Sequence, residues 1–307
     1  MRSQNVSTAT ESGEVANMLR KLKKITPGTV LIYLILSLFS LSIVVAFLHL
    51  LSISFSPSYI ATKGGLHLWP KDFTLDNYNE VFKNKFIWTG YKNTILITVV
   101  GTTIKLCFTA MGAYVLSKKY FPHRNLWTFF IVFTMFFSGG LIPSYLLNKN
   151  LGLMNNMLVL VLPSLISAYN LVIMRNFFQG LPEEIEESAM IDGAGRFKIF
   201  YAIVLPMSKP ILATVGLWLA VGHWNSWYDV LMYITDETKF TLQIVLRRIL
   251  LTGSKEIMEF SSSTTEMVSS EGLKAATIYV ATLPILCAYP FLQRYFVKGI
   301  NMGSLKG

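Results

Sequence analysis

Charged residues are scarce in this chain of 307 residues: Asp, Glu, Lys and Arg together make up 14% of it. Hydrophobic residues make up 52%, and the mean hydropathy is +0.48. A soluble domain with a single compact core does not show this balance. The composition therefore predicts an integral membrane protein.

Motifs that carry chemistry are also missing. The sequence has no G-x-x-x-x-G-K-[ST] phosphate loop, no catalytic triad, no paired-carboxylate site and no metal-ligating cluster. Its two cysteines, Cys107 and Cys287, both fall within apolar runs, where neither a structural disulfide nor a metal site is expected. We therefore expect no catalytic residue, no metal ion and no cofactor held by this chain.

Long apolar runs are abundant. A hydrocarbon core of about 30 Å is crossed by roughly 20 helical residues. Six runs have about this length, and we expect an all-α protein with six transmembrane helices at 29–55, 93–117, 126–147, 156–178, 210–234 and 275–296. The first run follows basic residues as in a signal peptide, but it is too long and lacks a convincing small-residue cleavage site. We expect an uncleaved first span.

Basic residues in short loops predict the orientation. The loop after the second run carries Lys118, Lys119 and Arg124, whereas the loop after the third has only Lys149. The C-terminal end is basic too, with Arg294, Lys298 and Lys306. Both termini are therefore expected in the cytoplasm. The net charge of +10 follows largely from this topology and from nearby anionic lipid, so it predicts no nucleic-acid partner.

The sequence divides into a cytoplasmic N-terminal tail (1–26), one membrane domain (27–300) and a short cytoplasmic C-terminal tail (301–307). Within the first tail, residues 14–25 have helical apolar spacing with interspersed basic residues, which fits either a helix on the inner leaflet or a solvated basic tail. Two long segments, 56–92 and 235–274, face outside and are expected to dock something. The first contains "LWPKDFTLDNYNEVF", which predicts a turn and then a short amphipathic helix.

The segment 180–209 is acidic, broken by glycine and too polar to lie in lipid. Pro182 suits a first helical turn, and the glutamates that follow place negative charge at the positive end of that helix. Gly193 and Gly195 then break the helix, and a second amphipathic piece runs to Pro206. The residues alone predict two short helices on the cytoplasmic side, either a docking element or an inert connector.

This segment resembles the "EAA" loop of permease subunits in binding-protein-dependent ABC importers. That pattern runs Glu-Ala-Ala, three residues, Gly, nine residues, Ile, one residue, Leu-Pro. Every spacing is kept here, and Ser188 in place of the middle alanine is the sole departure, as the matching positions show: Glu187, Ser188, Ala189, Gly193, Ile203, Leu205 and Pro206. "FTLDNYNEVF", "WNSW" and "QRYFVKGINMGSLKG" are similar to the carbohydrate-importing branch, and the resemblance covers nearly all of the chain from Pro27 onward.

The resemblance implies a type I ABC importer permease fold in the cell membrane of a prokaryote. It also implies the partners: a second permease subunit, two ATPase subunits that bind ATP and Mg²⁺, an extracytoplasmic solute-binding protein and an oligosaccharide. The loop, 181–206, would couple ATP-driven closure of the ATPases to the permease. The coupling residues would be Glu187, Ser188, Ala189, Asp192, Gly193, Ala194, Leu205 and Pro206. The C-terminal tail would reach towards the ATPases, and the segment 235–274 towards the binding protein.

Candidates for the solute path lie in the fifth and second runs. "GHWNSWYD" at 222–229 combines aromatic faces with an amide, which suits a sugar, and it singles out Trp224, Asn225 and Tyr228. The same cluster would also fit an interfacial aromatic belt. Lys105 lies near the middle of the second run, where a charge is costly. It could meet an acidic sugar, pair with a carboxylate of the partner permease, or snorkel to the interface.

Two other functions compete with oligosaccharide import. One is a membrane scaffold whose cytoplasmic knob recruits a regulator, and the other is transport of a non-sugar solute such as an amino acid or a polyamine. Co-purification of an ATPase separates the scaffold from the transporter. The ligand of the binding protein separates a sugar from the other solutes.

Overall fold

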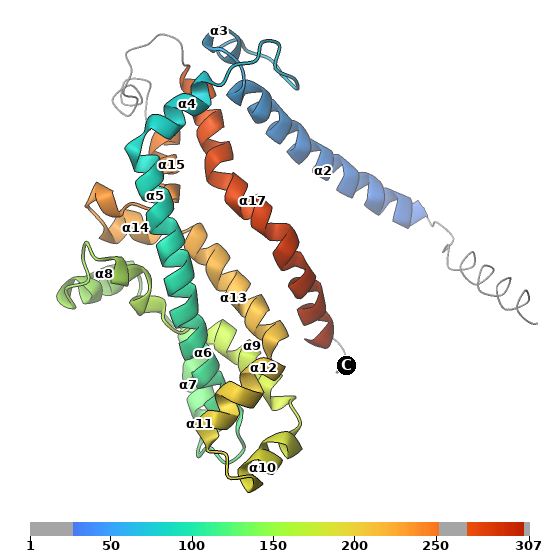
Figure 1. Cartoon of the computed structure of the whole chain (residues 1–307), viewed down its shortest axis with the longest axis vertical. Helices are drawn as coiled ribbons and strands as arrows, with labels where there is room; N and C mark the ends of the chain where they lie inside the picture. Colours follow the sequence, from blue (N-terminus) through green and yellow to red (C-terminus); the bar gives the residue numbers. More distant parts are fainter. Residues whose placement is uncertain (1–26, 252–268, 304–307) are drawn as a thin grey trace, which may run out of the picture.

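The computed structural model describes residues 27–251 and 269–303, with side chains as far as Cys287 and at Pro290. The expected helix at 14–25, residues 304–307 of the C-terminal tail and residues 252–268 of the second outer segment lie outside the described residues. The regular elements of the described part are helices (Figure 1). The main ones are α2 (Pro27–Ser54), α4 (Asp76–Lys83), α5 (Lys85–Leu96), α6 (Thr102–Ser117), α7 (Arg124–Phe136), α8 (Leu141–Asn150), α9 (Ala168–Gln179), α10 (Glu183–Ile191), α13 (Lys209–Trp224), α14 (Tyr228–Tyr233), α15 (Leu242–Leu251) and α17 (Ser270–Gly303).

Two of the described helices are each long and apolar enough to cross a membrane. They are α2 and the 33-residue helix Lys85–Ser117, in which the π-helical turn η1 (Ile97–Gly101) joins α5 to α6. Three bent pairs meet the same criteria when each is taken as one span, which raises the number to five: Arg124–Phe136 with Leu141–Asn150, Met157–Ser164 with Ala168–Gln179, and Arg196–Met207 with Lys209–Trp224.

Three of the six predicted spans are not single straight helices. The run 126–147 bends by 112° between α7 and α8, where Gly140 has φ +88°, a conformation that glycine adopts without strain. The run 156–178 starts as two 3₁₀ pieces, η2 (Met157–Leu160) and η3 (Leu162–Ser164), and bends by 52° before α9. The run 210–234 is divided between α13 and α14. The run 275–296 lies within α17.

Two buried clusters hold the helices together. The outer cluster joins α5, α14, α15 and α17 and contains Ile87, Leu242 and Ala276, each almost completely inaccessible to solvent. The inner cluster joins α6, α9 and α13 to the segment after α10 and contains Met174, Ile199 and Val215. The inner cluster includes residues that come before α10 in the sequence, such as Phe178, and residues that come after it, such as Ile199. The packing of these two flanking segments therefore determines the position of α10.

Helix α2 stands apart from this body (Figure 1). No residue of its 18-residue apolar window is buried. It contacts α17, where the Tyr279 hydroxyl donates a hydrogen bond to the carbonyl oxygen of Phe47. A helix that is apolar on all sides is stable only in lipid or against another apolar surface. Its position therefore agrees with a membrane-embedded helix.

One end of the body is built from α3 (Ser58–Ala61), α4 and α15, and α10 lies at the opposite end (Figure 1). The short amphipathic helix predicted in 56–92 is confirmed as α4. Buried Asn77 on α4 donates hydrogen bonds to the carbonyl oxygens of Ser54 and Ser56, at the end of α2. These hydrogen bonds therefore hold the segment 56–92 against the end of α2.

Candidate functional site

Helix α10 begins and ends where local chemistry predicts. Pro182 is its N-cap, with φ −60° and ψ 123°, and three glutamates lie in the first turn. Gly193 follows the last turn with φ +80°, and the amide of Ala194 donates to the carbonyl oxygen of Ala189 at 2.9 Å. The predicted start of the helix and its glycine break are both confirmed.

An ion pair anchors α10 to the end of α6. The Lys118 ammonium donates to Glu186 Oε1 at 2.5 Å, and the Tyr114 hydroxyl donates to Glu186 Oε2 at 3.0 Å. The side chains of Lys118 and Glu186 are each only 12% exposed. A shielded pair with a second hydrogen bond resists separation more than a solvated one does. This contact therefore makes α10 part of the body.

A second ion pair joins the same two segments at the surface. Lys119 Nζ lies 2.8 Å from Glu183 Oε1, with the two side chains 73% and 58% exposed. The hydrogen bond from Lys119 holds the pKa of the Glu183 carboxyl below its usual value. Solvent screens such a pair, so it contributes little to stability.

The chain after α10 turns back into the body. Helix α11 (Arg196–Ile199) leads through the π-helical η4 (Phe200–Val204) into α12 (Leu205–Met207), and the Ile199, Phe200 and Val204 side chains are buried in the inner cluster. The predicted second amphipathic piece is thus confirmed. It does not end at Pro206, because the chain stays helical to Met207 and bends by 82° before α13.

The eight predicted coupling residues fall into two groups. Ala189, Ala194 and Leu205 are half-buried and pack against the inner cluster, so they face the body of this chain. The others are exposed: Glu187, Ser188, Asp192, Gly193 and Pro206. These five residues lie at the surface of the described part of the chain.

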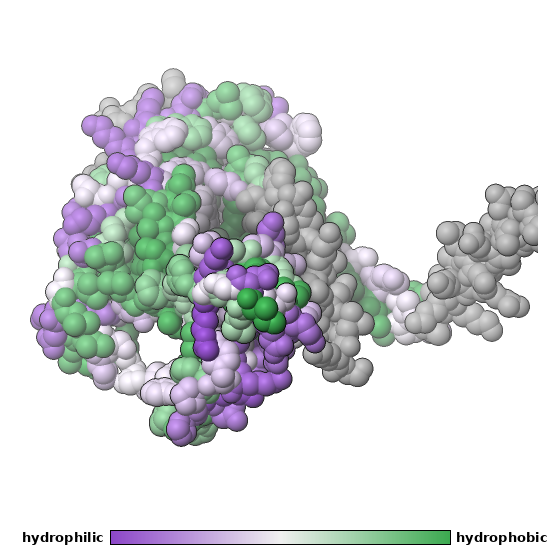
Figure 2. Space-filling view, turned by 60° about the horizontal axis from the view of Figure 1, so that its bottom comes forward, coloured by the Kyte–Doolittle hydropathy of each residue, from purple (hydrophilic) through white to green (hydrophobic). Residues whose placement is uncertain are grey.

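Large apolar side chains also reach the surface of this segment, and the sequence analysis did not single them out. Ile191 is 86% exposed, and Met190 and Phe197 are exposed as well. Figure 2, in which this end comes forward, shows hydrophobic residues among the hydrophilic ones there. Exposed apolar side chains on a polar knob indicate a protein contact. The signal in the sequence was Met190-Ile191 directly before Asp192 and the helix-ending glycine.

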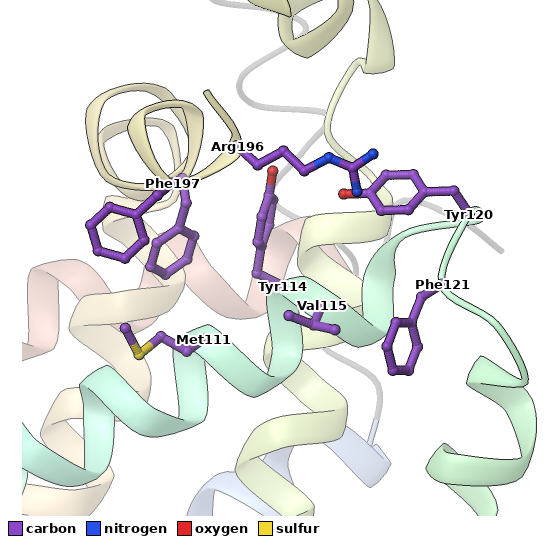
Figure 3. A pocket seen from close by; sticks show the side chains of 8 residues that line it. Met111, Tyr114, Val115, Tyr120, Phe121, Arg196 and Phe197 are labelled. Atoms are coloured by element: carbon purple, nitrogen blue, oxygen red, sulfur yellow. The ribbon is translucent and has the colours of Figure 1, made fainter. Parts of the chain in front are cut away.

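A cavity of about 460 Å³ lies beside this segment, between the end of α6 and α11 (Figure 3). Its lining is almost wholly apolar or aromatic and includes Met111, Phe197 and Phe200. The Arg196 guanidinium lies over the Tyr120 ring, 4.0 Å from its centroid. The segment 181–206 thus contacts the body through a cation–π contact as well as through ion pairs.

The four predicted path residues do not form one group. Trp224 lines an apolar pocket of about 200 Å³ together with Thr98 on η1 and Pro284 on α17. The Asn225 side chain donates back to the carbonyl oxygen of Val221, which makes it a helix cap. Tyr228 is exposed on α14 and lies edge-on to Trp227. Lys105 is on α6, in a separate polar cluster.

That polar cluster joins α6, η3, α13 and α14. Buried Lys105 donates a hydrogen bond to Ser164 Oγ at 2.7 Å. Asp229 and His223 lie close enough to Lys105 for its charge to affect their ionisation. His223 packs against Gly101, and its Nε2 atom is buried without a hydrogen-bond partner. Ser164, His223 and Asp229 were not predicted, because only the tertiary structure brings them to Lys105.

The chain is similar to known transport proteins. Protein LplC of Bacillus subtilis (strain 168) is 42% identical over 86% of this chain and 90% of its own length. The polygalacturonan/rhamnogalacturonan transport system permease protein YtcP of the same organism is 39% identical over 90% of this chain and 97% of its own length. A solved bacterial ABC transporter involved in the import of the acidic polysaccharide alginate has a chain with a TM-score of 0.82 and 32% identity, covering 87% of this chain and 95% of that one.

The family described as binding-protein-dependent transport system inner membrane component matches residues 119–302, more than half of the chain. The matched residues include α10 and the parts of both clusters that lie after α6, on α9, α13 and α14 among others. With the relatives above, this match shows that the chain belongs to the family of binding-protein-dependent ABC transport systems, as one of their membrane-embedded permease subunits.

Proposed function

We propose that the chain forms half of the translocation path for an oligosaccharide, which an external binding protein delivers and ATP hydrolysis drives inward. The observation that carries this proposal is α10: a helix anchored to α6 by a shielded ion pair that presents acidic and large apolar side chains away from the body. The relatives named for polygalacturonan, rhamnogalacturonan and alginate support a saccharide as the solute.

The assembly that we propose contains a second permease subunit and two ATPase subunits, in the cell membrane of a prokaryote. ATP and Mg²⁺ are bound by the ATPases. The exposed face of α10 seats in a groove of one ATPase, with Glu187 offering a charged contact and Ile191 an apolar one. When the ATPases close, the Glu186 anchor and the inner cluster transmit the movement of α10 to α6, α9 and α13.

An ATPase-docking experiment tests this proposal. Ile191→Asp places an uncompensated charge in the apolar contact, and we expect loss of ATPase co-purification and of ATP hydrolysis stimulated by the binding protein. The control for ATPase co-purification is Trp69→Asp, which changes a side chain of similar exposure, 82% against 86%, between α3 and α4. Binding-protein stimulation is not compared for this control, because the segment 56–92 is itself expected to dock an outside partner. If both variants retain the ATPase equally well, α10 is not the docking element.

The topology is tested separately. We propose six spans with both termini in the cytoplasm, which places Ser188 inside and Thr62 outside. Single cysteines at these positions are introduced after Cys107 and Cys287 have been replaced by serine. In intact cells a membrane-impermeant maleimide is expected to label the cysteine at 62 and to label the cysteine at 188 only after lysis. The reverse pattern would refute the orientation.

A further inference from the structure

Lys105 is a buried cation in the middle of a membrane-spanning helix. The residue is 7% exposed within Lys85–Ser117. A lysine at the centre of a membrane-spanning helix costs about 2.5 to 3.5 kcal/mol on insertion scales, and such residues usually face a water-filled path or a partner. Among the described residues no carboxylate lies within 4.0 Å of its ammonium group; the hydrogen bond that it donates goes to Ser164. A neutral hydroxyl does not neutralise this charge, and Asp229 interacts with it electrostatically without forming an ion pair.

The Lys105 ammonium group reaches an exposed residue although the lysine itself is buried. It donates its hydrogen bond to Ser164 on η3, which is exposed, as is Asp229 on α14. His223 is a second buried polar residue near Lys105, and it supports the presence of a water-filled path there. His223 is 5% exposed and its Nε2 atom has no partner among the described residues, which is unfavourable in a dry apolar site. Lys105 on α6 and His223 on α13 are therefore two buried polar residues on helices that pack against each other.

We propose that Lys105 is the residue that recognises the carboxylate of an acidic sugar unit as the oligosaccharide passes. This inference rests on the proposed function and narrows the solute to a uronate-containing oligosaccharide. A carboxylate that enters beside α14 replaces Ser164 as the acceptor of the Lys105 hydrogen bond, because a charged acceptor binds an ammonium group more strongly than a hydroxyl does.

Asp229 gives this site a way to release the sugar. The Asp229 carboxylate interacts electrostatically with Lys105 but does not form an ion pair with it. It therefore weakens the attraction of Lys105 for a second carboxylate. A transport path needs a site that binds strongly enough to admit the solute and weakly enough to let it leave. Ser164, the sugar and Asp229 thus compete for one ammonium group.

The test uses the complete complex, reconstituted in liposomes with its binding protein loaded to saturation. Uptake of an oligogalacturonate is compared with uptake of its carboxyl methyl ester, which keeps the sugar and removes the charge. Lys105→Met is expected to lower uptake of the acid by about tenfold or more and to leave the ester within about twofold. Lys105→Arg retains the charge and is expected to restore preference for the acid. Lys149→Met removes an exposed lysine outside the cluster and is the matched control.

Asp229→Asn supplies a second readout that a purely structural role would not produce. Without the competing carboxylate the acid is expected to bind more tightly and leave more slowly, so KM and kcat for the acid both fall while those for the ester stay unchanged. Equal loss of both sugars in Lys105→Met, with the complex still assembled, would overturn the carboxylate role. Wild-type uptake of neutral oligosaccharides alone would overturn the acidic solute but not import. Wild-type uptake of no oligosaccharide would refute the proposed function itself.

Discussion

Glu186→Ala tests whether α10 moves as one piece with the body. The change removes the acceptor of two hydrogen bonds, from Lys118 and Tyr114, and leaves the Lys118 ammonium largely shielded without a counter-charge. Breaking a fully buried ion pair costs about 3 to 5 kcal/mol. Both side chains here are 12% exposed, so part of this cost is relieved by water, and about 2 to 4 kcal/mol is expected.

That free energy corresponds to a fall of about 30-fold to several hundred-fold in the equilibrium constant for holding α10 against α6. Hydrogen exchange of the α10 amides measures this constant directly, because local opening sets the exchange rate. In the reconstituted complex we also expect fewer solute molecules to be transported per ATP hydrolysed, because α10 could then move without moving α6 with it. Glu186→Gln keeps the shape and one acceptor and is expected to lie between the wild type and alanine.

The control is Glu183→Ala, which removes the exposed partner in the neighbouring ion pair with Lys119. Solvent already screens that pair, so little change in α10 exchange and in coupling is expected. Equal effects of the two substitutions would mean that burial does not decide the strength of this anchor. No effect of Glu186→Ala on α10 exchange would mean that the inner cluster alone holds the segment.

Three further outcomes are expected. Gly193→Val forces a β-branched residue to φ +80° and should destabilise the segment by about 1 to 2 kcal/mol in thermal unfolding, whereas Gly195→Val, at φ −66°, should change little. Gly101→Ala would place a Cβ atom 2.8 Å from His223 Nε2, so loss of about 1 to 3 kcal/mol is expected; an unchanged Tm would show that the imidazole moves aside freely. The lowered pKa of Glu183 means that its contribution is present above the ordinary pKa of a carboxyl and is lost as pH falls through the lowered value. The protection of the α10 amides, corrected for the intrinsic exchange rate at each pH, should therefore not change between pH 7 and pH 6 on its account.

Local chemistry made parts of the coupling segment predictable. Pro182 and the glutamates after it define a helix start through backbone geometry and the helix dipole, and Gly193 defines its end through φ +80°; none of these effects needs a distant partner. Apolar runs likewise predicted two helices that are long and apolar enough to cross a membrane, α2 and Lys85–Ser117. They did not predict the bends, because a hydropathy pattern is the same for a straight helix and for one interrupted at Gly140.

The sequence by itself determined that this chain is a membrane protein with a helical, glycine-terminated element between two apolar runs, because composition and neighbouring residues suffice for both. Only the tertiary structure decided that Glu186 meets Lys118, 68 residues away, and that Lys105 meets Ser164, 59 residues away. It also decided that Ala189 faces the body while Ile191 faces outward. Contacts between distant segments depend on how the helices pack, and packing is a property of the whole chain that no single stretch encodes.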